Sequence, residues 1–83
     1  MAATEDYAQL IQQHIPEARA SVTGAGGKFE ATVISDAFAG KNMLARHRLV
    51  YAALDERIKS GELHAVSIRA YTPDEWNEVS GET

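Results

Sequence analysis

The chain has 83 residues, no cysteine and a formal net charge of −4. This length accommodates one small core, so it excludes a second domain and leaves little room for a deep, enclosed substrate cleft. Without cysteine, the chain can form neither a disulfide nor a thiolate metal site of its own. The apolar share of 45% is typical of a folded globular domain.

We therefore expect one domain over residues 1–83, frayed at about 1–3 and 79–83. The N-terminal residues Met1–Asp6 are acidic and lack the basic and apolar regions of a signal peptide. No apolar run approaches the roughly 18 residues of a membrane span. These features predict a cytoplasmic protein that does not insert into a membrane.

The first half of the chain predicts a helix followed by a β-hairpin. A stripe at i, i+3, i+4 and i+7 from Tyr7 predicts a helix from about Glu5 to Ile15, which Pro16 ends. Two segments of alternating polarity then predict two strands, whose inward residues are Ala18, Ala20 and Val22 in the first and Phe29, Ala31 and Val33 in the second. The glycine-rich run 24–27 predicts the turn between them.

The second half predicts a long helix, a third strand and a short final helix. After an irregular stretch at 35–41, Asn42 can cap a helix that breaks near Leu54 or Asp55 and ends before Gly61. Its apolar stripe comprises Met43, His47, Val50, Leu54 and Ile58. Val66, Ile68 and Ala70 point inward from a third strand. Thr72 and Glu75 form a capping box for the last helix, with Tyr71 against Trp76.

The order α-β-β-α-(α)-β-α predicts an α+β fold with a three-stranded mixed sheet and helices on one face. Three histidines are its ordinary nitrogen ligands for a metal. His14 lies on the apolar stripe of the first helix, where it is expected to pack or to lie at the helix end, and His47 lies on the core-facing stripe of the long helix, where it is expected to be a hydrogen-bonded structural histidine. His64 follows a helix stop and leads into a strand, where a ring nitrogen can reach outward as a ligand, or cap and pack.

The glycine-rich turn offers backbone N–H groups to an anion, but no helix and no GK[ST] follow it, so the phosphate-loop pattern is incomplete. Its letters also match the G-x-x-G clamp of KH domains, which joins two helices, whereas this one joins two strands. No serine stands in a nucleophile-elbow context and no paired carboxylates suggest a catalytic pocket. We expect a binding protein rather than an enzyme.

Basic residues gather in the second half of the chain and could form a local positive patch despite the acidic total. Arg46 and Arg48 flank the apolar stripe of the long helix, so both are predicted to face solvent. With Lys41 and Arg69 they are candidates to contact a partner's carboxylates or a phosphate backbone, or else form a solvated rim.

Three segments carry a family resemblance: residues 38–41 (FAGK), 46–54 (RHRLVYAAL) and 63–76 (LHAVSIRAYTPDEW) resemble BolA proteins. The ending is most similar to the branch that includes IbaG. The resemblance implies a class II KH-like fold and a complex with a monothiol glutaredoxin and its glutathione, sharing a [2Fe–2S] cluster that the isolated chain would lack. Alone, the chain is expected as a monomer or weak homodimer.

The resemblance also implies which residues meet the cluster. The family's histidine at the start of the third strand corresponds to His64. The second family ligand, a His or Cys directly before the hairpin phenylalanine, is replaced here by Lys28, before Phe29. A protonated lysine has no lone pair for iron, so the second ligand is unknown. The leading expectation is an adaptor in iron–sulfur trafficking or iron regulation, and the alternatives are a nucleic-acid-binding transcriptional or stress regulator and a purely structural interaction domain.

Overall fold

The computed structural model describes residues 3–25, 28–63 and 65–80. Within these ranges the chain forms, in order, α1 (Ala3–His14), β1 (Arg19–Ala25), β2 (Lys28–Ile34), the 3₁₀ helix η1 (Asp36–Phe38), α2 (Met43–Ala53), α3 (Asp55–Lys59), β3 (Ala65–Tyr71) and α4 (Pro73–Ser80). This order confirms the predicted α+β fold. Of the segments predicted to fray, 1–3 and 79–83, residues 1–2 and 81–83 lie outside the described residues, whereas residue 3 belongs to α1 and residues 79–80 belong to α4.

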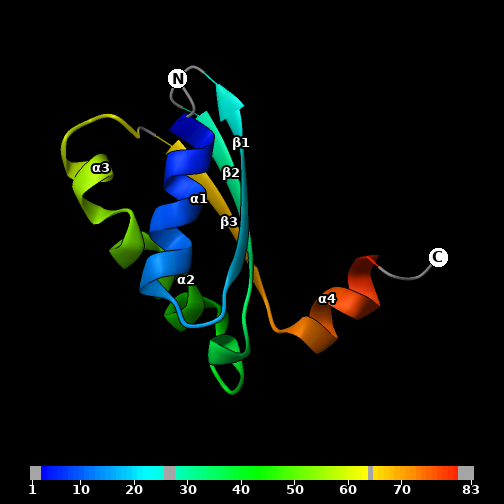
Figure 1. Cartoon of the computed structure of the whole chain (residues 1–83). Helices are drawn as coiled ribbons and strands as arrows, with labels where there is room; N and C mark the ends of the chain where they lie inside the picture. The colour runs from blue at the N-terminus through cyan, green and yellow to red at the C-terminus, as the bar shows by residue number, and fades with distance from the viewer. Residues whose placement is uncertain (1–2, 26–27, 64, 81–83) are drawn as a thin grey trace.

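The three strands form one mixed sheet with β2 at its centre. β1 pairs antiparallel with β2 because a short hairpin joins them, and β3 pairs parallel with β2 because a helical crossover returns the chain. Helices α1 and α2 cover one face of this sheet (Figure 1). The core lies between these two layers and comprises Tyr7, Ile11, Ile15, Ala31, Val33, Phe38, Val50, Leu54, Leu63 and Ala70.

The hairpin strands follow the predicted alternation, and β1 continues further than predicted. Ala18, Ala20 and Val22 pack against the core as expected. Gly24 and Ala25 belong to β1 rather than to the turn, and Gly24 has a φ of +136°. A Cβ at Gly24 would lie 2.3 Å from the Lys28 carbonyl oxygen, so the two strands approach too closely here for a side chain. The rest of the predicted turn, residues 26 and 27, lies outside the described residues.

The stretch predicted to be irregular contains η1, which carries Phe38 into the core. Ser35 is buried and organises this segment. Its hydroxyl donates to the Pro16 carbonyl over 2.8 Å and accepts from the Ala37 amide over 3.0 Å. The buried hydroxyl therefore satisfies its hydrogen bonds while joining the end of β2 to the α1–β1 connection.

Helix α2 begins and ends as the sequence predicts, but one member of its predicted apolar stripe is wrong. The Asn42 side chain accepts a hydrogen bond from the Ala45 amide over 2.9 Å, and the helix breaks at Leu54. Met43 is 57% exposed instead of packed in the core. The reason is that Arg46 takes the inward position in this first turn, which directs Met43 to solvent.

Helix α4 projects away from the two-layer body at the end of β3 (Figure 1). The predicted capping box is present: the Glu75 amide donates to the Thr72 hydroxyl over 3.2 Å, and the Thr72 amide donates to Glu75 Oε1 over 3.0 Å. The Tyr71 and Trp76 rings meet with centroids 5.4 Å apart, as the predicted staple requires. These contacts fix how α4 leaves the sheet.

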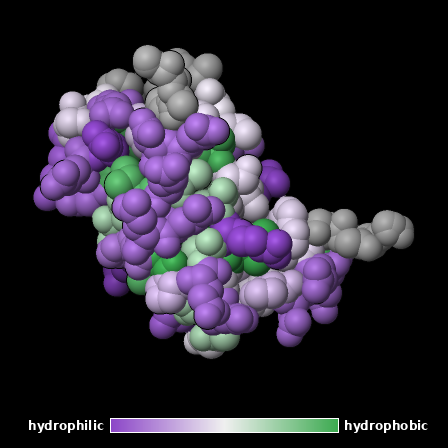
Figure 2. Space-filling model, in the orientation of Figure 1, coloured by the Kyte–Doolittle hydropathy of each residue, from purple (hydrophilic) through white to green (hydrophobic). Residues whose placement is uncertain are grey.

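The surface seen from the side of Figure 1 is mainly hydrophilic, with apolar patches separated by polar side chains (Figure 2). This view of the molecule therefore presents no single large apolar area.

Among the described residues, none of the helices has both the length and the apolar character that crossing a membrane requires.

Candidate functional site

The predicted site lies at the end of the sheet where β2 and β3 begin. Lys28 is paired with Ala65, and Phe29 with Val66. His64, the predicted metal contact, lies outside the described residues, and Ala65 is the residue that follows it in the chain. The parallel register therefore places Ala65, the residue after His64, beside Lys28. Lys28 stands at the hairpin position that corresponds to the second family ligand.

Tyr7 anchors the segment that leads into β3. Its hydroxyl donates to Glu62 Oε2 over 2.8 Å, and its ring meets the edge of Phe29 at a centroid distance of 5.3 Å. Burial and the hydrogen bond to Glu62 raise the pKa of Tyr7. The next residue, Leu63, is buried and its amide donates to the Arg57 carbonyl. The chain is therefore held to α1 and to α3 immediately before position 64.

The other two histidines do not share this end of the sheet. His14 is exposed in the last turn of α1, and the C-terminal end of α1 lies at the opposite end of the sheet from the start of β2 (Figure 1). His47 is half-buried in α2, and its Nε2 is buried without a hydrogen-bond partner among the described residues. The helix-end position predicted for His14 is confirmed, whereas the buried Nε2 of His47 lacks the hydrogen bond that was predicted for this histidine.

Arg46 does not face solvent, so that prediction was wrong. Only 9% of the residue is exposed, because its guanidinium turns inward to polar partners just before α2, on β3 and in the first turn of α4. Nε donates to the Lys41 carbonyl over 2.9 Å and Nη1 to the Ala70 carbonyl over 3.1 Å. Both Nη atoms also donate to the Glu75 carboxylate, over 2.6 and 3.1 Å.

The Arg46 side chain is consequently part of the framework rather than a free partner contact. Its guanidinium carbon lies 5.9 Å from the centre of the Phe38 ring, so an aromatic face completes its surroundings. Its hydrogen bond and positive charge hold the pKa of Glu75 at about 2. A guanidinium with this many internal bonds has little capacity left for a phosphate or a partner's carboxylate.

The remaining basic candidates lie on two different surfaces. Lys41 and Arg48 line one shallow hollow beside α2. Arg69 alternates with the core residues Ile68 and Ala70 along β3, so it points to the face of the sheet that α1 and α2 leave open. The predicted positive patch is therefore not assembled from these residues.

Sequence comparison identifies the family: the profile described as BolA-like protein matches residues 6–75. The chain belongs to the BolA family. An uncharacterised BolA relative encoded in the rpoN–murA intergenic region of Acinetobacter guillouiae is 39% identical over 77 residues, covering 93% of each chain. The acid stress protein IbaG of Escherichia coli is 40% identical over 55 residues, covering 66% of each chain, in line with the resemblance to the IbaG branch.

The BolA fold is equally evident in three dimensions. The solved structure of a BolA protein homologue from Coxiella burnetii superposes with a TM-score of 0.82 at 44% identity. The superposition covers 93% of this chain and 99% of that one. The predicted fold class is confirmed by this likeness.

The described residues of this BolA protein do not supply a donor set for a [2Fe–2S] cluster. They contain no group of three or more His, Asp or Glu side chains that could hold a metal ion. At the end of the sheet where β2 and β3 begin, Lys28 is exposed and offers an ammonium group, which has no lone pair. Coordination from this chain would therefore rest on His64, and the remaining ligands would have to come from a partner.

Replacing His47 with leucine is expected to stabilise this BolA protein. The substitution removes the buried, unpartnered Nε2 and fills the same space with apolar atoms. We expect the free energy of unfolding to rise by about 1 kcal/mol, which corresponds to a melting temperature roughly 4–8 °C higher. Thermal denaturation at pH 7 measures this, with the exposed His14→Leu as the control that should change little. A clear drop for His47→Leu would show that the ring makes a stabilising hydrogen bond.

Proposed function

We propose that this BolA protein is an adaptor that binds a monothiol glutaredoxin and shares a [2Fe–2S] cluster with it through His64, in iron–sulfur trafficking or iron regulation. The pairing of Lys28 with Ala65 supports this proposal most directly. This pairing places Lys28, at the hairpin position of one family ligand, beside Ala65, which follows His64, the position of the other family ligand. Because the chain belongs to the BolA family, these two positions can be compared with the ligand positions of that family.

The chemistry assigned to His64 is donation of an imidazole lone pair to iron. Imidazole in place of thiolate tends to raise the reduction potential of a cluster, as it does in Rieske centres. Lys28 would contribute charge rather than coordination, because its ammonium group attracts the negative charge of thiolate-bound iron without binding the metal. The complex is therefore expected to be more labile than one with two ligands from this chain.

The residues before position 64 support a preorganised contact. The hydrogen bond from Tyr7 to Glu62 and the burial of Leu63 restrict the approach to β3. A ligand held by packed neighbours loses less conformational entropy on binding than one on a loose loop. Residues 62 and 63 therefore need little further ordering when a partner binds beside them.

The experiment is a titration of this protein into cluster-loaded monothiol glutaredoxin under anaerobic conditions, followed by visible circular dichroism. The wild-type protein is expected to change the spectrum, because a new ligand alters the asymmetry around iron. His64→Ala should abolish the change. His14→Ala is the matched control, since it removes an exposed imidazole at the other end of the molecule, and it should behave as wild type.

Two outcomes would overturn the proposal. Identical spectra for wild type and His64→Ala would remove the metal role of that residue. Loss of the change in His14→Ala as well would show that the response does not depend on the end of the sheet where β2 and β3 begin.

A further inference from the structure

The face of the sheet opposite α1 and α2, the open face, carries unpaired positive charge. Because side chains alternate along a strand, it presents the cations Arg19 from β1, Lys28 from β2 and Arg69 from β3, and Glu30 is the one carboxylate that the described strand residues add to it. All four residues are exposed, and the ion pairs between described residues involve other cations. The open face is therefore locally positive in a chain whose net charge is −4.

Helix α4 carries the opposite charge along one side. Asp74, Asn77 and Glu78 are exposed and spaced at i, i+3 and i+4, so they lie together on the helix surface. Among the described residues, Asp74 and Glu78 form no ion pair, whereas Glu75 is paired with Arg46 over 2.6 Å. This acidic side of α4, formed by Asp74, Asn77 and Glu78, therefore offers two carboxylates to cations from elsewhere.

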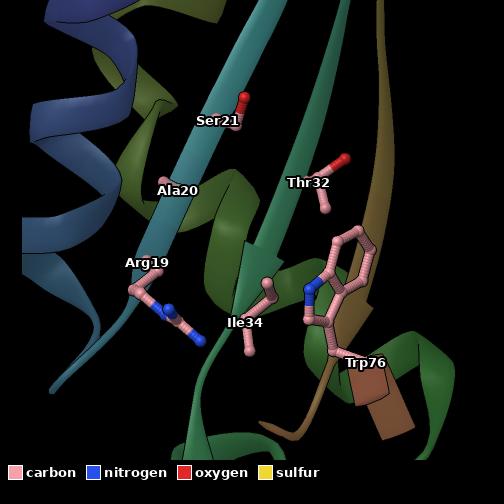
Figure 3. Close-up of a pocket in the computed structure, with 6 residues that line it drawn as sticks. All are labelled: Arg19, Ala20, Ser21, Thr32, Ile34 and Trp76. Carbon is pink, nitrogen blue, oxygen red and sulfur yellow. The ribbon is translucent and has the colours of Figure 1, made fainter. Parts of the chain in front are cut away.

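The two charged surfaces belong to the same side of the sheet. Helices α1 and α2 lie on the other side, and α4 extends on the open one (Figure 1). A hollow of about 320 Å³ lies between α4 and the strands β1 and β2, lined by Arg19, Ala20, Ser21, Thr32, Ile34 and Trp76. The Trp76 ring forms one wall beside Thr32 and Ile34, and Arg19 lies across from it (Figure 3). The open face and α4 thus form two arms of opposite charge with a recess between them.

Helix α4 is held in this position by contacts at its first turn. The Arg46 guanidinium binds both the Glu75 carboxylate and the Ala70 carbonyl, and the capping box fixes the first residues of the helix. The Trp76 ring packs against Tyr71 at a centroid distance of 5.4 Å. Swinging the acidic side onto the cations of the same chain would break these contacts. The matching charges can therefore meet without this cost only between two molecules.

We propose that two copies of this chain associate about a two-fold axis, with the acidic side of α4 from each copy docked on Arg19 and Arg69 of the other. A second copy is favoured over an unrelated acidic protein because every molecule carries both surfaces. A two-fold dimer therefore makes two equivalent contacts at once. Complementary charge at both contacts selects this partner and this orientation.

The spacing of the charges suits this contact. Arg19 and Arg69 lie on the two outer strands, and their partners on β2 are two residues apart, which places the two Cα atoms roughly 12 Å apart. Asp74 and Glu78 are about 6 Å apart along the helix axis, and the long arginine side chains can converge on them. Three strands of seven residues measure roughly 23 Å by 14 Å. Such an interface is small, so the dimer should be weak and sensitive to salt.

The test is sedimentation equilibrium of the isolated protein without iron or glutaredoxin, so its result is separate from that of the adaptor proposal. The wild type should shift from monomer to dimer across the micromolar to millimolar range at low salt, and about 1 M salt should weaken the dimer. The face variant Arg19→Glu/Arg69→Glu and the helix variant Asp74→Lys/Glu78→Lys each place like charges at both contacts. Each alone should self-associate about tenfold or more weakly than the wild type.

Mixing these two variants provides the decisive comparison. In the mixed dimer the basic helix meets the acidic face and the acidic helix meets the basic face, so both contacts are restored and the affinity should return to near that of the wild type. Lys41→Glu/Arg48→Glu is the matched control, because it makes the same change of charge on the α2 surface. It should dimerise like the wild type and should not capture the helix variant as the face variant does.

A wild type that stays monomeric at millimolar concentration in low salt would overturn the proposal. So would a dimer that survives in either charge-reversed variant alone, or equal capture of the helix variant by the control. A mixture that stays monomeric, although far-ultraviolet circular dichroism shows both variants to be folded, would have the same meaning. Should the helix variant unfold, Asp74→Asn/Glu78→Gln removes the same carboxylates, and an unweakened dimer in that variant would contradict the contact.

Discussion

Replacing Arg46 with leucine is expected to lower the free energy of unfolding by about 2–3 kcal/mol, which corresponds to a fall in melting temperature of roughly 10 °C. The Arg46 guanidinium supplies hydrogen bonds to the carbonyls of Lys41 and Ala70. Ala70 is only 2% exposed, so its carbonyl cannot readily turn to water when the donor is removed. Leucine retains some packing against Phe38 but donates no hydrogen bond.

The decrease in the free energy of unfolding caused by Arg46→Leu should be smaller at acidic pH, because part of it depends on the negative charge of Glu75. The hydrogen bond from Arg46, followed by the one from the Thr72 amide, lowers the pKa of Glu75 from 4.5 to about 2. A carboxyl whose pKa is lowered on folding contributes stability that is present above about pH 4.5 and is lost as the pH falls towards 2. The gap between wild type and Arg46→Leu should therefore narrow over that interval. Glu75→Gln, which keeps an oxygen for the capping box, should remove this part of the pH dependence.

Arg48→Leu is the matched control for the same helix. Arg48 is exposed and makes no ion pair with another described residue, so its replacement should change stability by less than about 0.5 kcal/mol. Denaturant unfolding at pH 7 and at pH 3 measures all three variants. If Arg46→Leu were as stable as Arg48→Leu at pH 7, the framework role of Arg46 would be wrong.

Replacing Lys28 with cysteine is expected to prolong the life of the shared cluster by about tenfold or more. The proposal leaves this chain with one ligand, and position 28 corresponds to the second ligand of the family. A thiolate there could donate to iron, which an ammonium cannot. Even partners outside the ligand sphere change metal affinity by about 10–100-fold, so a direct ligand should act at least as strongly.

Lys28→Ser is the control, because serine differs from cysteine only in its oxygen and removes the same charge. The side chain of Lys28 is exposed, so neither replacement should disturb the core. The measurement is the decay of visible absorbance of the glutaredoxin complex after a chelator is added under reducing, anaerobic conditions. Equal decay for the cysteine and serine variants would show that position 28 does not reach the iron.

Local features of this fold were predictable from the sequence because neighbouring residues determine them. Asn42 caps α2, Thr72 and Glu75 form the capping box, and the break at Leu54 lies where it was predicted. Each depends on residues within a few positions of one another. The alternation of polarity likewise determined which faces of β1, β2 and β3 meet the core.

The burial of Arg46 could not be predicted in the same way, because its partner Glu75 is 29 residues away and comes from another helix. An arginine on the flank of an apolar stripe is typical of a surface position, and only the tertiary fold turns it inward. The link between Tyr7 and Glu62 spans 55 residues and gave no local signal. Trp76 was predicted to meet Tyr71, but the hollow that it forms with Arg19 required the strands to be placed side by side.

In the candidate site, the sequence placed Lys28 and His64 at the ends of predicted strands, and the resemblance gave them roles. The structure adds the register that pairs Lys28 with Ala65. It also places Arg69 on a different surface from Lys41 and Arg48. The reason is that side chains alternate along β3, whereas the turns of α2 direct its side chains elsewhere. The distance between these residues in the sequence could not predict this.

The most direct test of the adaptor proposal is calorimetric titration of this protein with cluster-loaded and with cluster-free glutaredoxin under anaerobic conditions. If His64 donates to iron, wild type should bind the loaded form about tenfold more tightly or better, equivalent to about 1.4 kcal/mol. His64→Ala should bind both forms with equal affinity. Equal affinity of wild type for the two forms, or a preference that survives in His64→Ala, would contradict the account.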